Sequence, residues 1–118
     1  MAEFRFQNLE IWKRAVTMAH TLFDLADKLE EKRLYRFAEQ LRGAALSVPN
    51  NIAEGSGSES AREFDQFLGF ARRSIYETAN MLYIFADRKL VTRELADALV
   101  QELEELSRMI TGFRRSLR

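Results

Sequence analysis

The sequence has 118 residues, in which 18 Lys and Arg balance 18 Asp and Glu, with one histidine and no cysteine. A chain of this length folds around one core, so we expect a single domain over residues 1–118. The absence of cysteine excludes thiol nucleophiles, zinc ribbons and iron–sulfur clusters. Zero net charge provides no overall attraction to nucleic acid or to anionic lipid, so a charged partner has to be met locally.

No run of 18 or more apolar residues occurs, and Met1 to Asn8 lacks the apolar stretch of a secretory signal. We therefore expect a cytoplasmic protein without a membrane partner.

Two segments with apolar residues at helical spacing fill the first half of the chain. The first covers residues 9–29 and follows Asn8, a candidate N-cap. The second covers residues 34–54 and contains Pro49, which predicts a bend because the apolar spacing continues beyond it. Gly55 is predicted to form its C-terminal cap.

Two more helical segments follow a short loop rich in glycine and serine. The third covers residues 61–87 and is opened by Ser60 and Glu63, which have the spacing of a capping box. The fourth covers residues 93–117 and is opened by Thr92. The predicted fold class is therefore all-α: an antiparallel up-and-down four-helix bundle whose second helix is bent at its proline.

The first and third helices carry more than one apolar stripe, whereas a lone bundle needs one stripe per helix. We expect the surplus to be covered by another copy of the chain. The alternative is a monomer with scattered exposed apolar residues.

Signatures of catalysis are missing from the sequence. There is no Glu-x-x-His pair for a di-iron centre, no phosphate-binding loop, and no serine close in sequence to His20. We predict no catalytic residue, metal site, cofactor or small-molecule substrate. One catalytic alternative is Arg14 with His20, whose spacing resembles that of HEPN ribonucleases. On an unbroken helix these two side chains lie about 240° apart and do not converge.

Arginine supplies 14 of the 18 basic residues, which favours bidentate pairing with carboxylate or phosphate. The third helix has an outward stripe without acidic residues, formed by Arg62, Gln66, Gly69, Arg73, Tyr76 and Asn80. The residues predicted to contact nucleic acid are Arg62, Arg72, Arg73, Arg108, Arg115 and Arg118. The alternatives are that the terminal arginines complement the helix dipole, and that the others pair with acids of a neighbouring helix.

Residues 40–55 read QLRGAALSVPNNIAEG and resemble the bacterial 23S ribosomal RNA intervening-sequence-encoded family of four-helix-bundle proteins. The opening FQNLEIW at residues 6–12 and the block at residues 63–77 extend the resemblance over nearly the whole chain. It implies a bundle that assembles into a homo-oligomer, typically a pentamer, and that binds nucleic acid. Similar accessory proteins of diversity-generating retroelements are basic pentamers that bind RNA and a reverse transcriptase.

The residues that carry this signature are Arg42, Ser47, Pro49, Asn51, Glu54, Gly55 and Glu77. We interpret them as structural, because a proline, two amides and a glycine can fix the exit of the second helix. The carboxylates expected to form ion pairs there are Glu54 and Glu77, with Arg42 or Arg72 as their partner. The alternative is a ligand pocket built by Asn50, Asn51 and Glu54.

These patterns predict a non-enzymatic four-helix bundle that associates with itself and acts as a scaffold, with RNA or DNA as its partner. A protein-interaction scaffold without nucleic-acid binding is the first alternative. A HEPN-like ribonuclease is the second.

Overall fold

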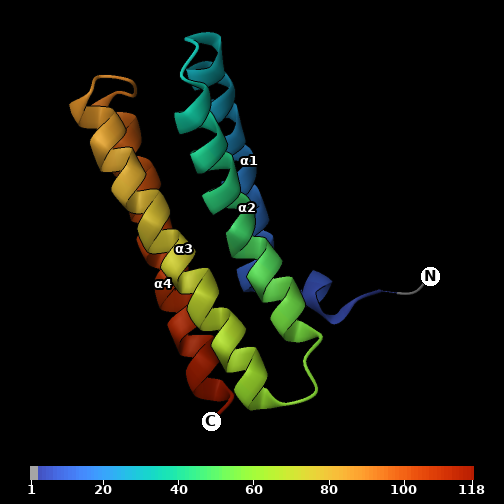
Figure 1. Ribbon diagram of the computed structural model, residues 1–118. Helices are drawn as coiled ribbons and strands as arrows, with labels where there is room; N and C mark the ends of the chain where they lie inside the picture. The colour runs from blue at the N-terminus through green and yellow to red at the C-terminus, as the bar shows by residue number, and fades with distance from the viewer. Residues whose placement is uncertain (1–2) are drawn as a thin grey trace.

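Four long helices make up nearly all of the structure, a computed structural model that describes residues 3–118. The helices are α1 (Glu10–Glu31), α2 (Tyr35–Ser56), α3 (Ala61–Asp87) and α4 (Arg93–Ser116), and a 3-10 turn, η1 (Arg5–Asn8), precedes α1. Short loops join consecutive helices, and the chain turns back at each of them (Figure 1). No strand occurs in residues 3–118, and the prediction of an all-α four-helix bundle is confirmed.

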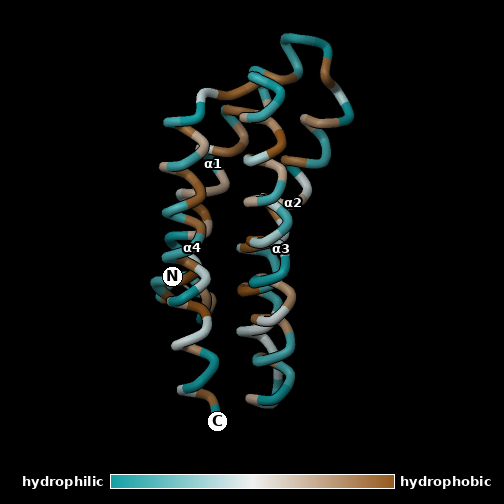
Figure 2. Tube along the Cα trace, turned by 90° about the vertical axis from the view of Figure 1, so that its left-hand side faces the viewer, coloured by the Kyte–Doolittle hydropathy of each residue, from teal (hydrophilic) through white to brown (hydrophobic). Residues whose placement is uncertain are grey.

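The apolar stripes of the four helices meet in one core. Leu22 of α1, Leu41 of α2, Leu68 of α3 and Leu103 of α4 are among its fully buried side chains. Each such burial contributes about 1.5–3 kcal/mol to folding. Figure 2 shows hydrophobic and hydrophilic segments alternating along each helix, as expected for helices that bury one side.

The predicted N-cap residues of α3 and α4 are confirmed, although within the described residues only the Ser60 half of the capping box forms, and the N-cap predicted for α1 is not found. Ser60 Oγ accepts a hydrogen bond from the Glu63 amide at 3.1 Å, and Thr92 caps α4 in the same way. The predicted N-cap Asn8 is wrong, because η1 ends at Asn8 and Leu9 occupies the cap position without a side-chain hydrogen bond.

Gly55 has a different role from the one predicted. It lies inside α2, which ends at Ser56, and Gly57 follows as the C-cap. A Cβ atom at Gly55 would lie 2.7 Å from Cβ of Phe67 and 2.8 Å from Cδ1 of Phe64. The glycine therefore allows α2 and α3 to pack closely, and the prediction of a C-terminal cap is wrong. Pro49 lies inside α2 and is buried; the bend of the helix axis stays a prediction.

The apolar surplus predicted for the first helix is largely covered within the chain. Trp12 is half-buried and packs against Phe6 of η1 at 5.0 Å between ring centroids, and Phe23 is also partly buried against the core. The surplus on α3 remains exposed, at Phe70, Tyr76, Tyr83 and Ile84. An uncovered apolar surface therefore exists on α3 but not along α1.

Candidate nucleic-acid interface

The stripe predicted to face outward on α3 is at the surface. Arg62, Arg73, Tyr76 and Asn80 are exposed, and Gly69 is half-buried. Among the described residues, neither Arg62 nor Arg73 forms an ion pair. Their guanidinium groups can therefore bind an anion without first breaking an ion pair within the chain.

Arg72 lies beside this stripe and is held against Tyr76. Its guanidinium carbon lies 5.0 Å from the centroid of the tyrosine ring, and Nη2 donates a hydrogen bond to the phenol oxygen at 3.1 Å. The Nε atom of Arg72 is buried and has no hydrogen-bond partner within residues 3–118. Cation–π contact and hydrogen bond together fix the positions of the arginine and the ring. Arg72 is therefore not the partner of Glu54 or Glu77, contrary to that prediction.

The arginines predicted to bind nucleic acid on α4 differ in their contacts. Arg108 forms an ion pair with Glu104 one turn earlier, whereas Arg118 lies 3.8 Å from the Asp65 carboxylate of α3. Arg115 is exposed and forms no ion pair with another described residue. Of these three, Arg115 alone has a charge without an acidic partner in this part of the structure.

The ion pair between Asp65 and Arg114 joins the start of α3 to the end of α4. Arg114 donates to both carboxylate oxygens, from Nε at 2.9 Å and from Nη2 at 3.3 Å. These hydrogen bonds hold the pKa of the Asp65 carboxyl below its usual value and raise the pKa of Arg114. Gly69 lies next to the guanidinium, since a Cβ there would be 3.4 Å from its nitrogens.

This contact also brings arginines of the two predicted groups to one end of the bundle. It places Arg62, at the start of α3, and Arg115 and Arg118, near the end of α4, at the same end of the bundle (Figure 1). Arg73 lies eleven residues beyond Arg62, or about 16 Å along the helix axis.

Two signature residues, Ser47 and Asn51, form hydrogen bonds within α2 and to Ser74 of α3. Asn51 Nδ2 donates to the carbonyl oxygen and the hydroxyl of Ser47 at 2.8 and 3.0 Å, and the Ser74 hydroxyl donates to Ser47 Oγ at 2.8 Å. The Asn51 amide nitrogen is thus used within the helix, while Asn50 and Glu54 are exposed. This pattern supports the structural interpretation of the signature.

Arg42 of α2 forms ion pairs with α1 and not with the carboxylates predicted as its partners. It contacts the carboxylates of Asp27 at 2.7 Å, Glu30 at 3.1 Å and Glu39 at 3.2 Å, and the hydrogen bonds to Asp27 and Glu30 raise its pKa. The predicted pairing of Arg42 with Glu54 or Glu77 is therefore wrong. Two of its acidic partners come from α1, and their position depends on how that helix packs.

The residues of the ribonuclease alternative make separate contacts. Arg14 forms an ion pair with Glu105 of α4 at 3.1 Å, whereas His20 lies edge-on to Phe23 of its own helix. No hydrogen bond connects them within the described part of the chain.

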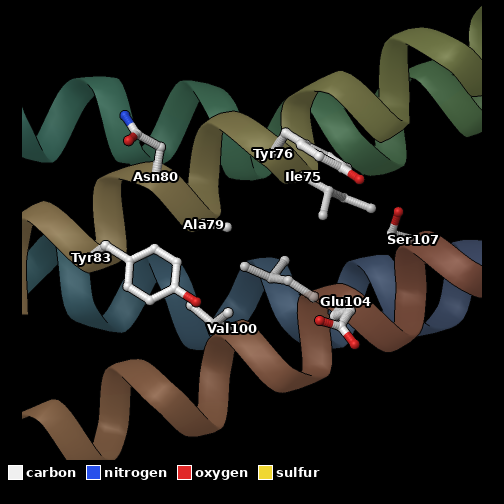
Figure 3. Close-up of a pocket in the computed structure, with 9 residues that line it drawn as sticks. Ile75, Tyr76, Ala79, Asn80, Tyr83, Val100, Glu104 and Ser107 are labelled. Carbon is white, nitrogen blue, oxygen red and sulfur yellow. The ribbon is translucent and has the colours of Figure 1, made fainter.

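A groove between α3 and α4 was not anticipated from the sequence. It has a volume of about 370 Å³, and Tyr76 and Tyr83 of α3 lie along it opposite Val100 and Glu104 of α4 (Figure 3). The sequence predicts that Tyr76 lies on the outward stripe of α3. The groove cannot be predicted in the same way, because its second wall is formed by α4, and the alignment of α4 with α3 is not visible in the sequence. The seven-residue spacing of the two tyrosines is the signal in the sequence that could have indicated it.

A family model described as "23S rRNA-intervening sequence protein" matches residues 7–112. The chain belongs to this family. The resemblance read from the sequence signature is thereby confirmed. No curated protein matches this chain. Within residues 3–118 it has no helix that is both long and apolar enough to cross a membrane.

A solved structure has the same fold as this chain. It is the crystal structure of a protein of unknown function from the S23 ribosomal protein family of Bacteroides thetaiotaomicron. The two chains superpose with a TM-score of 0.84 over 88% of this chain and 97% of the other, at 19% sequence identity. At this identity the similarity shows a shared bundle architecture.

Proposed function

We propose that this protein is a non-catalytic scaffold that associates with itself and binds RNA weakly through the arginines of α3. The observation that carries the proposal is that Arg62 and Arg73 are exposed on one stripe without an ion pair to any described residue. Arg72 adds a third cation next to them and likewise has no acidic partner in that part of the chain. Arginine guanidinium groups bind phosphate with two hydrogen bonds.

Weak binding is expected because the chain as a whole is neutral. Its acidic residues repel RNA from other surfaces, so attraction is confined to this face and is weakened by salt. Because only a few phosphates are contacted, the affinity should fall less with salt concentration than that of a strongly basic protein does.

Self-association is supported by exposed apolar residues on α2 and α3. Leu46 is 47% exposed, Phe70 47% and Ile84 45%. Gly43 of α2 lines hollows shared with Leu46 and with Ile84, and a Cβ at this position would contact nothing within 4 Å. An exposed glycine inside a helix costs about 1 kcal/mol relative to alanine. Close approach of a helix from a second copy would account for it.

RNA binding is tested by filter binding at low salt, with Arg62→Ala plus Arg73→Ala compared with the parent protein. We expect weaker binding, a shallower dependence on salt and unchanged helix content. The matched control is Arg36→Ala plus Arg88→Ala, which removes two exposed arginines from helix ends elsewhere in the bundle. Equal binding by the parent and by the variant at residues 62 and 73 would refute the role of these arginines.

The oligomer is tested by light scattering at micromolar protein concentration. A pentamer, which the family resemblance implies, has a mass of about 69 kDa, five times the 13.8 kDa chain. Leu46→Glu plus Ile84→Glu is expected to lower the mass. Leu95→Glu, on an exposed residue of α4, is the control and should leave it unchanged. A parent protein that stays at 13.8 kDa would refute self-association.

A protein-interaction scaffold without RNA binding is the second candidate, and the same exposed apolar residues favour it. It predicts an oligomer with no RNA retained at low salt. The two assays together therefore distinguish the candidates.

A further inference from the structure

The groove between α3 and α4 has two aromatic side chains on one wall. Tyr76 is 60% exposed and Tyr83 is 47% exposed, and they lie seven residues apart, or about 10 Å along α3. Figure 3 shows Ala79 between them, with both phenol oxygens directed toward the start of α3. Two large aromatic surfaces are thus available to a ligand that lies along this helix.

The rest of the groove combines an apolar base with a few polar groups. Ile75 and Leu103 are buried, and Val100 is half-buried. Ser107 and Glu104 provide polar atoms from α4, and the charge of Glu104 is offset by Arg108. Concave, mostly apolar surfaces with a few polar groups are typical of ligand sites.

The arginines around the groove favour an anionic ligand. Arg72 is stacked on Tyr76, which restricts the ring before any ligand arrives and lowers the entropy lost on binding. Arg73 lies three residues before Tyr76, about 5 Å along the axis, and makes no ion pair with the described residues. Two cationic groups therefore precede the two aromatic groups along α3.

Exposed aromatic rings distinguish single-stranded from double-stranded RNA. The bases of a duplex are stacked on one another, whereas those of a single strand can stack on aromatic side chains while arginines bind the phosphates. The exposed aliphatic residue Ile84 lines a hollow between α2 and α3, which adjoins this groove at Asn80. The surface suited to a second copy and the tyrosine groove are thus neighbouring surfaces of α3.

We infer that Tyr76 and Tyr83 stack on unpaired bases of single-stranded RNA, while Arg72 and Arg73 bind its phosphates. The inference rests on the proposed function, because it assumes that this face binds RNA, and it adds the class of RNA and the residues that select it.

The experiment compares a labelled 12-nucleotide single-stranded RNA with a duplex of the same length, by fluorescence anisotropy at low salt. Tyr76→Leu plus Tyr83→Leu keeps apolar bulk and removes both rings. We expect at least about a fivefold loss of single-strand affinity for each ring removed, with little change for the duplex. Tyr76→Phe plus Tyr83→Phe keeps both rings but removes the Arg72–Tyr76 hydrogen bond, so its single-strand affinity should lie between those of the parent and of the leucine variant.

The outcomes separate this inference from the proposed function. If the leucine variant binds the single strand as well as the parent does, while Arg62→Ala plus Arg73→Ala weakens binding, the stacking role is refuted and RNA binding stands. If neither RNA binds the parent protein, both are refuted. A parent preference for duplex RNA refutes the stacking role. So does a leucine variant with a lower particle mass by light scattering, because the groove would then be a subunit contact.

Discussion

The close packing of α2 on α3 at Gly55 leads to a prediction with a matched control. In Gly55→Ala the new methyl group would lie 2.7 Å from Cβ of Phe67, an atom attached to the backbone of α3. Because that atom cannot rotate away, the helices must separate, at a cost of about 1–3 kcal/mol. The alanine regains about 1 kcal/mol of helix propensity, so we expect a net loss of up to about 2 kcal/mol.

Gly43→Ala in the same helix should have the opposite effect. The added methyl group contacts nothing within 4 Å, so only the propensity term remains, a gain of up to about 1 kcal/mol. Urea unfolding followed by circular dichroism measures both variants. The particle mass has to be recorded at the same protein concentration, because Gly43 belongs to the surface proposed for self-association and dissociation would lower the apparent stability. Two changes of the same sign, at constant mass, would refute the packing role of Gly55.

Further predictions concern an ion pair, a loop and a hydrogen bond. Asp65→Asn should destabilise the protein by about 1 kcal/mol at neutral pH. Because Arg114 lowers the folded-state pKa of Asp65, this stabilisation is present above the unfolded pKa near 3.8 and is lost as pH falls through the folded value. The deficit relative to the parent should thus shrink in acid, and a constant deficit would contradict this origin. Lys89 follows α3 with a φ of 61°, so Lys89→Gly should raise stability by about 0.5–1 kcal/mol in thermal unfolding, whereas Lys89→Ala should give no gain. Ser74→Ala removes the hydrogen bond to Ser47 and should cost about 1 kcal/mol, and a double-mutant cycle with Ser47→Ala that shows no coupling would refute the contact's contribution.

Local patterns in the sequence were sufficient to predict the helices and two of their caps. Ser60 and Thr92 each bond to an amide three residues away, so their partners lie within the same short segment. Asn8 shows the limit of such reasoning, since the preceding residues form a separate 3-10 turn. In that turn the Gln7 side chain accepts a hydrogen bond from the Phe4 amide, and α1 starts after Leu9.

The contacts between helices could not be read from the sequence. Asp65 and Arg114 are 49 residues apart, and their pairing depends on the rotation of α3 and α4 about their axes. Arg42 was expected to pair near the end of α2, but its neighbours on α1 supply two of its carboxylates. The exposure of the α3 stripe followed from helical spacing alone, whereas the tyrosine groove required the alignment of α4 beside it.

The contact between Trp12 and Phe6 can be followed by tryptophan fluorescence. Trp12 is the single tryptophan, so its emission senses the docking of the N-terminal turn, while circular dichroism senses the four helices together. If the turn detaches before the bundle melts, the fluorescence transition comes at lower denaturant concentration than the loss of helix. Coincident curves would mean that the turn and the bundle unfold as one cooperative unit.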